Sequence, residues 1–241
     1  LMTSCGEYQS LLKSNDYNLV YKKAIEYYNK GDYQRAMNLL DGVRSVFVGQ
    51  AKAQNIAYYR AFCSYNMKDY QIASDLFKQF IQTYPESSFA EECLYMMGFC
   101  DYKASPKPRL DQQVTEKAIR EFQLYLSRYP YSMRKDKVNT YMDEMRDKLS
   151  YKAYLSAKNY YLREHYKAAV ISLQNCLKDY PGSKYREEIM YMLFVSKYQM
   201  AVNSVEDKKV ERYNNAREEY YYFADEYPNS RYAADVKKMY E

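Results

Sequence analysis

Apolar positions recur along the chain at helical spacing, with polar residues between them. The clearest stripe consists of tyrosine pairs seven residues apart: Tyr21 and Tyr28, Tyr58 and Tyr65, Tyr95 and Tyr102, Tyr154 and Tyr161, and Tyr191 and Tyr198. Between the members of each pair lie, in order, Ala24, Ala61, Gly98, Ala157 and Phe194. Residues three, four and seven apart share one face of a helix. The stripe therefore predicts five amphipathic helices.

A second motif predicts where helices end. The tetrapeptide Tyr-Pro-x-Ser begins at Tyr84, Tyr129, Tyr180 and Tyr227. Tyr closes one helix, Pro cannot continue it, and Ser is suited to cap the next. Twelve residues before each Pro lie Ala73, Ala118, Ala169 and Ala216, and Ala36 fits the same frame without a Pro. Small residues at these places let two helices approach closely, so each segment is predicted to be a helical hairpin.

Short turns join the two helices of three segments. Their sequences are Gly31-Asp32-Tyr33, Lys68-Asp69-Tyr70 and Glu164-His165-Tyr166. The small residue, this turn, the alanine and the closing Pro together resemble the tetratricopeptide repeat. The resemblance implies an all-α fold, a right-handed superhelical solenoid of about five tetratricopeptide-like helix-turn-helix repeats. We expect the repeats to begin near Tyr17, Gln50, Ser87, Ser132 and Ser183, with a capping helix from Tyr232 to Glu241.

Two irregularities interrupt the repeats near the middle of the chain. The third repeat carries a basic, turn-forming insertion that includes Pro106, Lys107, Pro108 and Arg109. The fourth begins with a charged stretch, predicted to be an extended helix with Val138, Tyr141, Met145 and Leu149 on one stripe. We therefore expect an N-terminal tether at 1–16, repeats one to three at 17–132, and repeats four and five with the capping helix at 133–241.

Composition and charge narrow the class of protein. The 241 residues include 33 Tyr but no Trp, and only six Gly and six Pro, which favours long helices over many tight turns. The 36 basic and 31 acidic residues give a net charge of +5 and are interspersed. No basic arm is present, so we expect no nucleic-acid partner. No segment approaches the roughly 18 consecutive apolar residues of a membrane-spanning helix.

Candidate catalytic and metal-binding residues are few. The one histidine, His165, occupies a turn position whose counterparts are Asp32 and Asp69. No phosphate-binding glycine loop occurs, and acidic pairs such as Glu91-Glu92 fit exposed helix faces. We therefore expect no catalytic residue, no metal and no cofactor, and hence a protein that is not an enzyme. Four further cysteines, Cys63, Cys93, Cys100 and Cys176, fit buried thiols, although a disulfide between two of them is also compatible with the sequence.

The tyrosine ladder has two interpretations. Its positions lie near the centre of each apolar stripe, which favours packing against the partner helix. Alternatively, the first helices of such repeats line an inner groove, where stacked rings could hold an extended peptide. The candidate groove residues are Tyr21, Tyr58, Phe62, Tyr95 and Phe99.

The first residues, Leu1-Met2-Thr3-Ser4-Cys5-Gly6, resemble the lipobox of bacterial lipoproteins, with Met2 at a place where Leu is usual. In that pattern a signal peptide is removed before the cysteine, which then carries the lipid. The resemblance implies lipidation of Cys5, and several acyl chains would give stable anchoring. The polar residues from Glu7 to Asp16 are then expected to tether the fold to a membrane.

The lipobox-like start followed by these repeats resembles the family of the outer-membrane protein assembly factor BamD. The residues that carry the resemblance are Cys5-Gly6, the Tyr-Pro-x-Ser motifs, and Lys30-Gly31-Asp32-Tyr33 with Ala36. It implies a lipid-anchored scaffold on the periplasmic face of the outer membrane. The implied partners are a periplasmic domain of the β-barrel assembly component and targeting segments of unfolded outer-membrane proteins, with Pro106, Lys107, Pro108 and Arg109 as a candidate partner loop.

Two other functions fit the same sequence. The first is a periplasmic repeat lipoprotein that acts as an adaptor for cell-wall or division enzymes. The second is a cytosolic receptor for chaperone tails, in which case Cys5 has no role in anchoring. Lipidation of Cys5 distinguishes the second from the others, and the partners isolated from envelope membranes distinguish the first from an assembly factor.

Overall fold

The computed structural model describes residues 3–241, and the side chains from residue 6 onward. The predicted lipid site, the side chain of Cys5, lies outside the described residues. Within the described part the chain forms helices and no strands. The helices are α1 (Thr3–Leu12), α2 (Tyr17–Asn29), α3 (Tyr33–Val43), α4 (Ala51–Asn66), α5 (Tyr70–Thr83), α6 (Ala90–Ala104), α7 (Gln113–Arg128), α8 (Lys135–Leu162), α9 (Tyr166–Asp179), α10 (Arg186–Val202), α11 (Glu206–Glu226) and α12 (Ala233–Tyr240).

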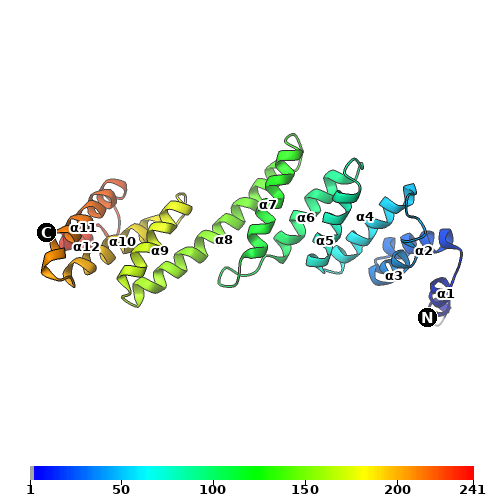
Figure 1. Ribbon diagram of the computed structural model, residues 1–241, viewed down its shortest axis with the longest axis horizontal. Helices are drawn as coiled ribbons and strands as arrows, with labels where there is room; N and C mark the ends of the chain where they lie inside the picture. The colour runs from blue at the N-terminus through cyan, green and yellow to red at the C-terminus, as the bar shows by residue number, and fades with distance from the viewer. Residues whose placement is uncertain (1–2) are drawn as a thin grey trace. The chain divides into compact units, whose positions relative to one another are not determined.

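The chain divides into two compact units. One comprises the chain up to Pro106 together with Leu110–Met145, and the other comprises Lys107–Arg109 together with Arg146–Glu241. In the first unit α2 pairs with α3, α4 with α5, and α6 with α7 as helical hairpins, and neighbouring hairpins pack through α3 with α4 and α5 with α6 (Figure 1). The all-helical repeat architecture predicted from the sequence is therefore confirmed.

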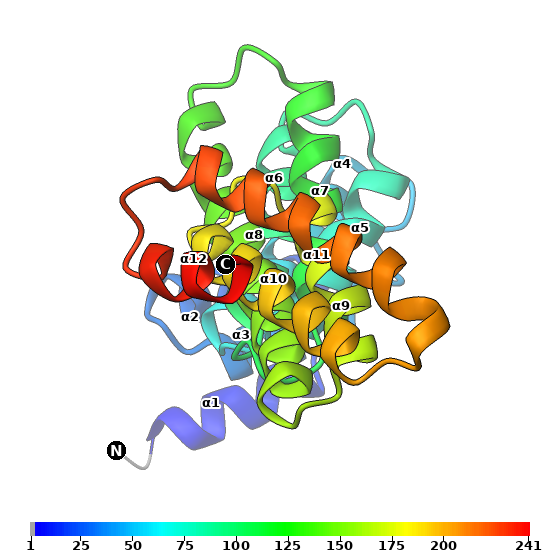
Figure 2. The same cartoon turned by 90° about the vertical axis from the view of Figure 1, so that its left-hand side faces the viewer.

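In the second unit, the C-terminal part of α8 packs with α9 around Tyr154, Ala157, Ala169 and Leu173. Helices α10 and α11 form the next hairpin, and the short helix α12 packs against both of them (Figure 2). Phe194, Phe223 and Val236 come one from each of these three helices and are buried together. Burial of such side chains from water is the main source of stability in a stack of this kind.

The small residues of the stripe lie where helices cross, as predicted. Ala24, Ala61 and Ala157 are fully buried. Gly98 shows the reason most directly, because a β-carbon built on it would lie 2.9 Å from Cδ1 of Phe122. Phe122 is itself fully buried in the core of the first unit, so α6 and α7 can approach this closely only where a side chain is missing.

The turns within the hairpins share one backbone conformation. Gly31, Lys68 and Glu164 have φ angles of 80°, 68° and 59°, in the left-handed region. At each turn the next residue donates a backbone hydrogen bond back to the preceding helix, as Asp69 does to the carbonyl of Ser64 at 2.9 Å. This is the Schellman arrangement, for which Gly is preferred. Lys68 and Glu164 adopt it at a cost in backbone strain.

The Tyr-Pro-x-Ser motif ends helices as predicted but begins them differently. Tyr84, Tyr129, Tyr180 and Tyr227 are the C-terminal caps of α5, α7, α9 and α11. The motif serine is not the N-cap that we predicted. Its hydroxyl accepts a hydrogen bond from the backbone N–H two residues later, as Ser230 does from Tyr232 at 3.0 Å. The serine thereby closes a separate turn that precedes the helix.

Two further expectations, on the N-terminal segment and on the start of the fourth repeat, have different outcomes. Residues 3–12, within the segment that we expected to be a polar tether, form helix α1. Tyr8 and Leu11 of α1 are buried in the core formed by α2 and α3, because they lie three residues apart and share a face. The extended helix predicted for the fourth repeat is present as α8, with Val138 and Met145 fully buried.

Candidate protein interaction surface

One tyrosine in the first helix of each repeat is covered by a residue from the start of the repeat or capping helix that follows. The five pairs, with ring-centroid or charge-to-centroid distances, are Tyr21–Lys52 at 5.7 Å, Tyr58–Phe89 at 4.6 Å, Tyr95–Arg134 at 4.9 Å, Tyr154–Tyr185 at 4.4 Å and Tyr191–Tyr232 at 4.1 Å. Aromatic pairs and cation–π pairs of this geometry stabilise a contact beyond the free energy gained from the apolar area that they bury. Each of these tyrosines therefore lies at the contact between successive repeats, which we call a seam.

Sequence reasoning missed these covering residues, although a signal was present. Phe89, Arg134, Tyr185 and Tyr232 each lie two residues after the serine of a Tyr-Pro-x-Ser motif. Three of the four are aromatic, and the fourth is the cation that best replaces an aromatic ring over tyrosine. Extending the motif by two positions would have predicted an inter-repeat contact.

The tyrosine hydroxyls at two seams bind a carboxylate of the next repeat. Tyr58 donates to Oε2 of Glu92 at 2.8 Å, and Tyr154 donates to Oε2 of Glu188 at 2.8 Å, in both cases 34 residues later. Burial, reinforced by the hydrogen bond to Glu92, raises the pKa of Tyr58 above its usual range. The hydroxyl therefore stays protonated and acts as a donor.

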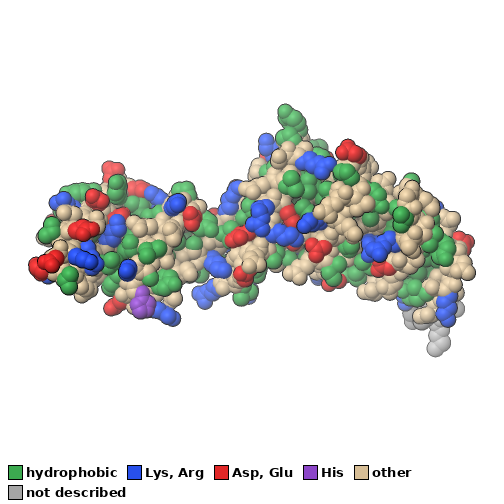
Figure 3. Space-filling model, in the orientation of Figure 1, with side chains coloured by type: hydrophobic (Ala, Val, Ile, Leu, Met, Phe, Trp, Pro, Cys, Tyr) green, Lys and Arg blue, Asp and Glu red, His purple; other side chains and the backbone are tan. Residues whose placement is uncertain are grey.

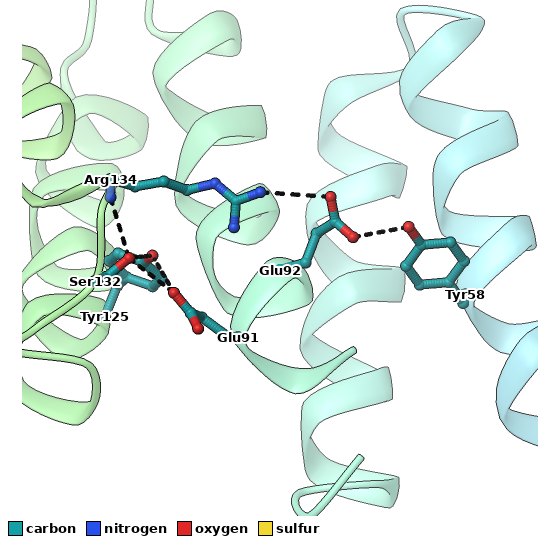
Figure 4. A network of polar contacts seen from close by, with 6 residues as sticks. All are labelled: Tyr58, Glu91, Glu92, Tyr125, Ser132 and Arg134. Atoms are coloured by element: carbon teal, nitrogen blue, oxygen red, sulfur yellow. Dashed lines mark hydrogen bonds and ion pairs between the residues drawn. The ribbon is translucent and has the colours of Figure 1, made fainter. Parts of the chain in front are cut away.

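A polar network joins α4, α6, α7 and the turn before α8 (Figure 4). Glu91 Oε1 accepts hydrogen bonds from the Tyr125 hydroxyl at 2.9 Å and from the Ser132 hydroxyl at 2.7 Å. On the neighbouring residue, Glu92 Oε1 lies 3.6 Å from the guanidinium of Arg134. The acidic pair Glu91-Glu92, which the sequence placed on an exposed face, is thus half-buried and holds successive repeats in register.

The candidate groove residues fall into two clusters. Tyr21 packs on Phe47 at 6.2 Å within the core of the first hairpin. The other four belong to the next core, where Tyr58 lies 4.5 Å from Phe62 and Tyr95 stacks on Phe99 at 5.6 Å. Tyr95 is buried, with 8% of its surface exposed, while Tyr58, Phe62 and Phe99 are half-buried.

The half-buried rings form a connected array. Phe62 contacts Tyr65 at 6.4 Å, and Tyr65 contacts Phe99 at 6.2 Å, so the array bridges α4 and α6. Phe99 in turn contacts Tyr102 at 5.9 Å. We name the set Tyr58, Phe62, Tyr65, Phe99 and Tyr102 the aromatic array. It leaves partly exposed ring edges on the first helices of two adjacent repeats.

A charged cluster lies between α5, α6 and α7, with the carboxylates of Asp101 and Glu121 buried. The ammonium of Lys117 lies 2.8 Å from Asp101 Oδ2 and 3.6 Å from Glu121 Oε1. Asp101 also accepts a hydrogen bond from Ser74 at 3.0 Å. Glu121 Oε2 is buried without a hydrogen-bond partner among the described residues. Burial, together with the nearby carboxylate of Asp101, raises the pKa of Glu121 to about 8.

The remaining candidate residues carry no catalytic arrangement. His165 is exposed at the start of α9. Cys63, Cys93, Cys100 and Cys176 are buried free thiols, and burial raises the pKa of Cys63 to about 12 and that of Cys176 to about 11. Within the described side chains, no group of three His, Cys, Asp or Glu is placed to hold a metal ion. In the same residues no helix has the length and apolar character required to cross a bilayer.

The chain matches one family model and is similar in structure to solved repeat proteins. The family model described as "YfiO: Outer membrane lipoprotein" matches residues 13–188 and, in a second match, residues 153–241. No match was found among curated proteins. The chain is similar to the crystal structure of a TPR-repeat protein from Bacteroides fragilis, with 13% identity, coverage of 94% of this chain and 97% of that chain, and a TM-score of 0.45. It is also similar to the TPR2AB domain of yeast Sti1, solved in complex with pHSP90, with 14% identity, coverage of 93% and 96%, and a TM-score of 0.42.

Proposed function

Because the chain belongs to the YfiO family of outer membrane lipoproteins, we propose that it is a lipid-anchored scaffold subunit of the machinery that assembles β-barrel proteins in the outer membrane. The family matches, which together reach from residue 13 to residue 241 and so include every helical hairpin, carry this proposal. The helical repeat fold and the family are typical of proteins that bind other proteins. The lipid is attached to Cys5, and the chain lies on the periplasmic side of the membrane.

The proposed partners are the periplasmic domain of the β-barrel assembly component and segments of unfolded outer-membrane proteins. Such segments are extended and rich in aromatic residues. The aromatic array offers ring edges that are already ordered by the core beneath them, which lowers the entropy cost of binding. Clients therefore bind along α4 and α6, over Phe62 and Phe99. Tyr21, Tyr58 and Tyr95 support this surface through the seams that they form.

Replacing Phe62 and Phe99 with Leu is expected to weaken binding of an aromatic-rich barrel-strand peptide by about tenfold, because two ring contacts are lost while the core volume is largely kept. Fluorescence anisotropy of a labelled peptide measures the change. Phe223→Leu is the matched control, since Phe223 is buried in the second unit with 1% exposure. Equal affinity of the double variant and the control would contradict the proposed client site.

Affinity isolation of the chain from solubilised envelope membranes tests the assembly role itself. We expect the β-barrel assembly component to co-purify, and mass spectrometry of the N-terminal peptide to show acylated Cys5. Cell-wall or division enzymes in its place would contradict the proposal and favour an adaptor.

The candidate partner loop is tested in the same assay with Lys107→Glu and Arg109→Glu, since both side chains are exposed. Undiminished co-purification of this variant would exclude the loop.

A further inference from the structure

One of the four Tyr-Pro-x-Ser turns differs from the others on its outer side. In each turn, the residues that flank the serine are exposed. The flanking pairs are Glu86 and Ser88, Tyr131 and Met133, Gly182 and Lys184, and Asn229 and Arg231. Only the turn between α7 and α8 has large apolar side chains at both positions. The inter-repeat seam does not require them, because the other three turns form their seams without them.

The exposure of these two side chains is complete. Tyr131 is 98% exposed and Met133 is 103% exposed, measured against an isolated residue. Hydrophobic side chains protrude at the turn between α7 and α8 in the space-filling view (Figure 3). The apolar area of both side chains stays in water, so burying it against a ligand would be favourable.

The turn that carries these side chains is held in place. The Ser132 hydroxyl lies between them in sequence, donates to Glu91 at 2.7 Å and lies 2.6 Å from the Tyr125 hydroxyl. It also accepts the backbone N–H of Arg134 at 3.2 Å. These contacts fix the middle residue on the inner side, while the residues on both sides of it are exposed to solvent. A tip ordered in advance loses little entropy when it binds.

Basic residues lie on both sides of the turn from Tyr131 to Met133 in the sequence. Arg128 ends α7, and Lys135 and Lys137 lie in the first turn of α8, all three exposed. The one acidic residue between Arg128 and Lys137 is Asp136. An apolar turn flanked by basic residues is complementary to an anionic lipid surface. The Tyr131 ring and the Met133 thioether would enter the headgroup boundary, while the basic groups remain at the phosphates.

We propose that the Tyr131–Met133 turn is a second membrane contact, which inserts its two apolar side chains into the surface of an anionic lipid bilayer. A bilayer fits this feature better than a protein partner, because two projecting side chains bury far less than the roughly 1,000 Å² that a specific protein interface needs. Each basic residue close to an anionic surface adds to the attraction. The inference is independent of a lipid on Cys5 and of the β-barrel assembly role.

The absence of tryptophan from the chain makes a direct test possible. The full chain is made with Cys5→Ser, so that it is unacylated, and with Met133→Trp as its only tryptophan. On addition of phosphatidylglycerol vesicles we expect the emission to shift to shorter wavelength and to be quenched by brominated acyl chains. The effect should weaken with phosphatidylcholine vesicles and with added salt, since the basic residues are exposed to screening.

The matched control is a chain with Cys5→Ser and with Ser88→Trp as its only tryptophan, because Ser88 occupies the equivalent place in the preceding motif. It should show no shift. A second variant, Tyr131→Ser with Met133→Ser, should reduce co-sedimentation with the vesicles by about tenfold without changing thermal stability, since both side chains are exposed. No shift at position 133, or equal shifts at 88 and 133, would overturn the proposal. So would capture of a protein, and not of lipid, by a photoreactive side chain at position 133.

Discussion

Glu121→Gln is expected to increase the free energy of unfolding by roughly 2–4 kcal/mol at pH 9 and to change it little at pH 5. The physical reason is the cluster of Asp101, Lys117 and Glu121. Asp101 has Ser74 and Lys117 as partners, whereas Glu121 Oε2 has none among the described residues, so a proton is retained on Glu121. Burial raises its pKa from 4.5 to about 8.

The sign of the effect follows from proton binding. Between pH 4.5 and about 8 the folded chain keeps the proton on Glu121 and the unfolded chain releases it. The folded state then binds more protons, so its stability falls as the pH rises through this window. Glutamine has the shape of the protonated acid but does not titrate. The variant therefore lacks the decrease in stability between pH 4.5 and about 8. Lys117 faces Glu121, with Asp75 4.0 Å from Lys117, and both remain in the variant.

Urea unfolding of the wild type and the variant at several pH values measures this difference. Glu116→Gln serves as the control, because Glu116 is an exposed residue on the same helix, paired with Arg120. Its effect should be small and should not grow between pH 5 and 9. If Glu121→Gln shifted the stability by the same amount at both pH values, Glu121 would not hold a proton in the folded chain.

Glu91→Ala is expected to lower the free energy of unfolding by about 2–4 kcal/mol, because the substitution removes the acceptor of two hydroxyls at once. Tyr125 is fully buried, so its hydroxyl would then keep only the Ser132 hydroxyl as a partner. Glu91→Gln retains an acceptor oxygen and should cost less than half as much. Chemical denaturation provides the measurement.

The matched control is Glu86→Ala, at an exposed position of the preceding turn. It should change the stability by less than about 0.5 kcal/mol. Equal effects of the two alanine substitutions would show that the network in Figure 4 contributes no stability. A large effect of Glu91→Ala confined to the first unit, with the second unit unfolding as before, would also show that the two units are stabilised separately.

The helical hairpins could be predicted from the sequence because each is specified locally. The spacing of Tyr21, Ala24 and Tyr28 fixes one helix face, and Pro85 and its equivalents mark where the chain turns. Helix α1 was missed because only two of its described residues, Tyr8 and Leu11, face the core, and two apolar residues in a polar segment do not make a recognisable period. The role predicted for Cys5 is supported by the family alone.

The polar contacts between repeats could not be predicted in the same way. Glu91 and Glu92 are adjacent in sequence and look like an exposed acidic pair, yet one binds Tyr125 and the other binds Tyr58, on helices to either side. Which residues meet depends on how one hairpin is rotated on the next, and that rotation is set by packing between hairpins such as Phe89 against Tyr58. The proposed client site on Phe62 and Phe99 stays a prediction until binding is measured.

The cover that each repeat places over the tyrosine of the preceding one makes the stack directional. Truncation before Tyr232, the N-cap of α12, would uncover the ring of Tyr191 and expose it to solvent. Truncation after α9 would expose Tyr154 in the same way, because Tyr185 would be lost. Unfolding within the second unit should therefore begin by fraying at its C-terminal helix and spread inward one hairpin at a time. Amide protons of α12 should exchange with solvent faster than those of α10, which gives this order a measurable gradient.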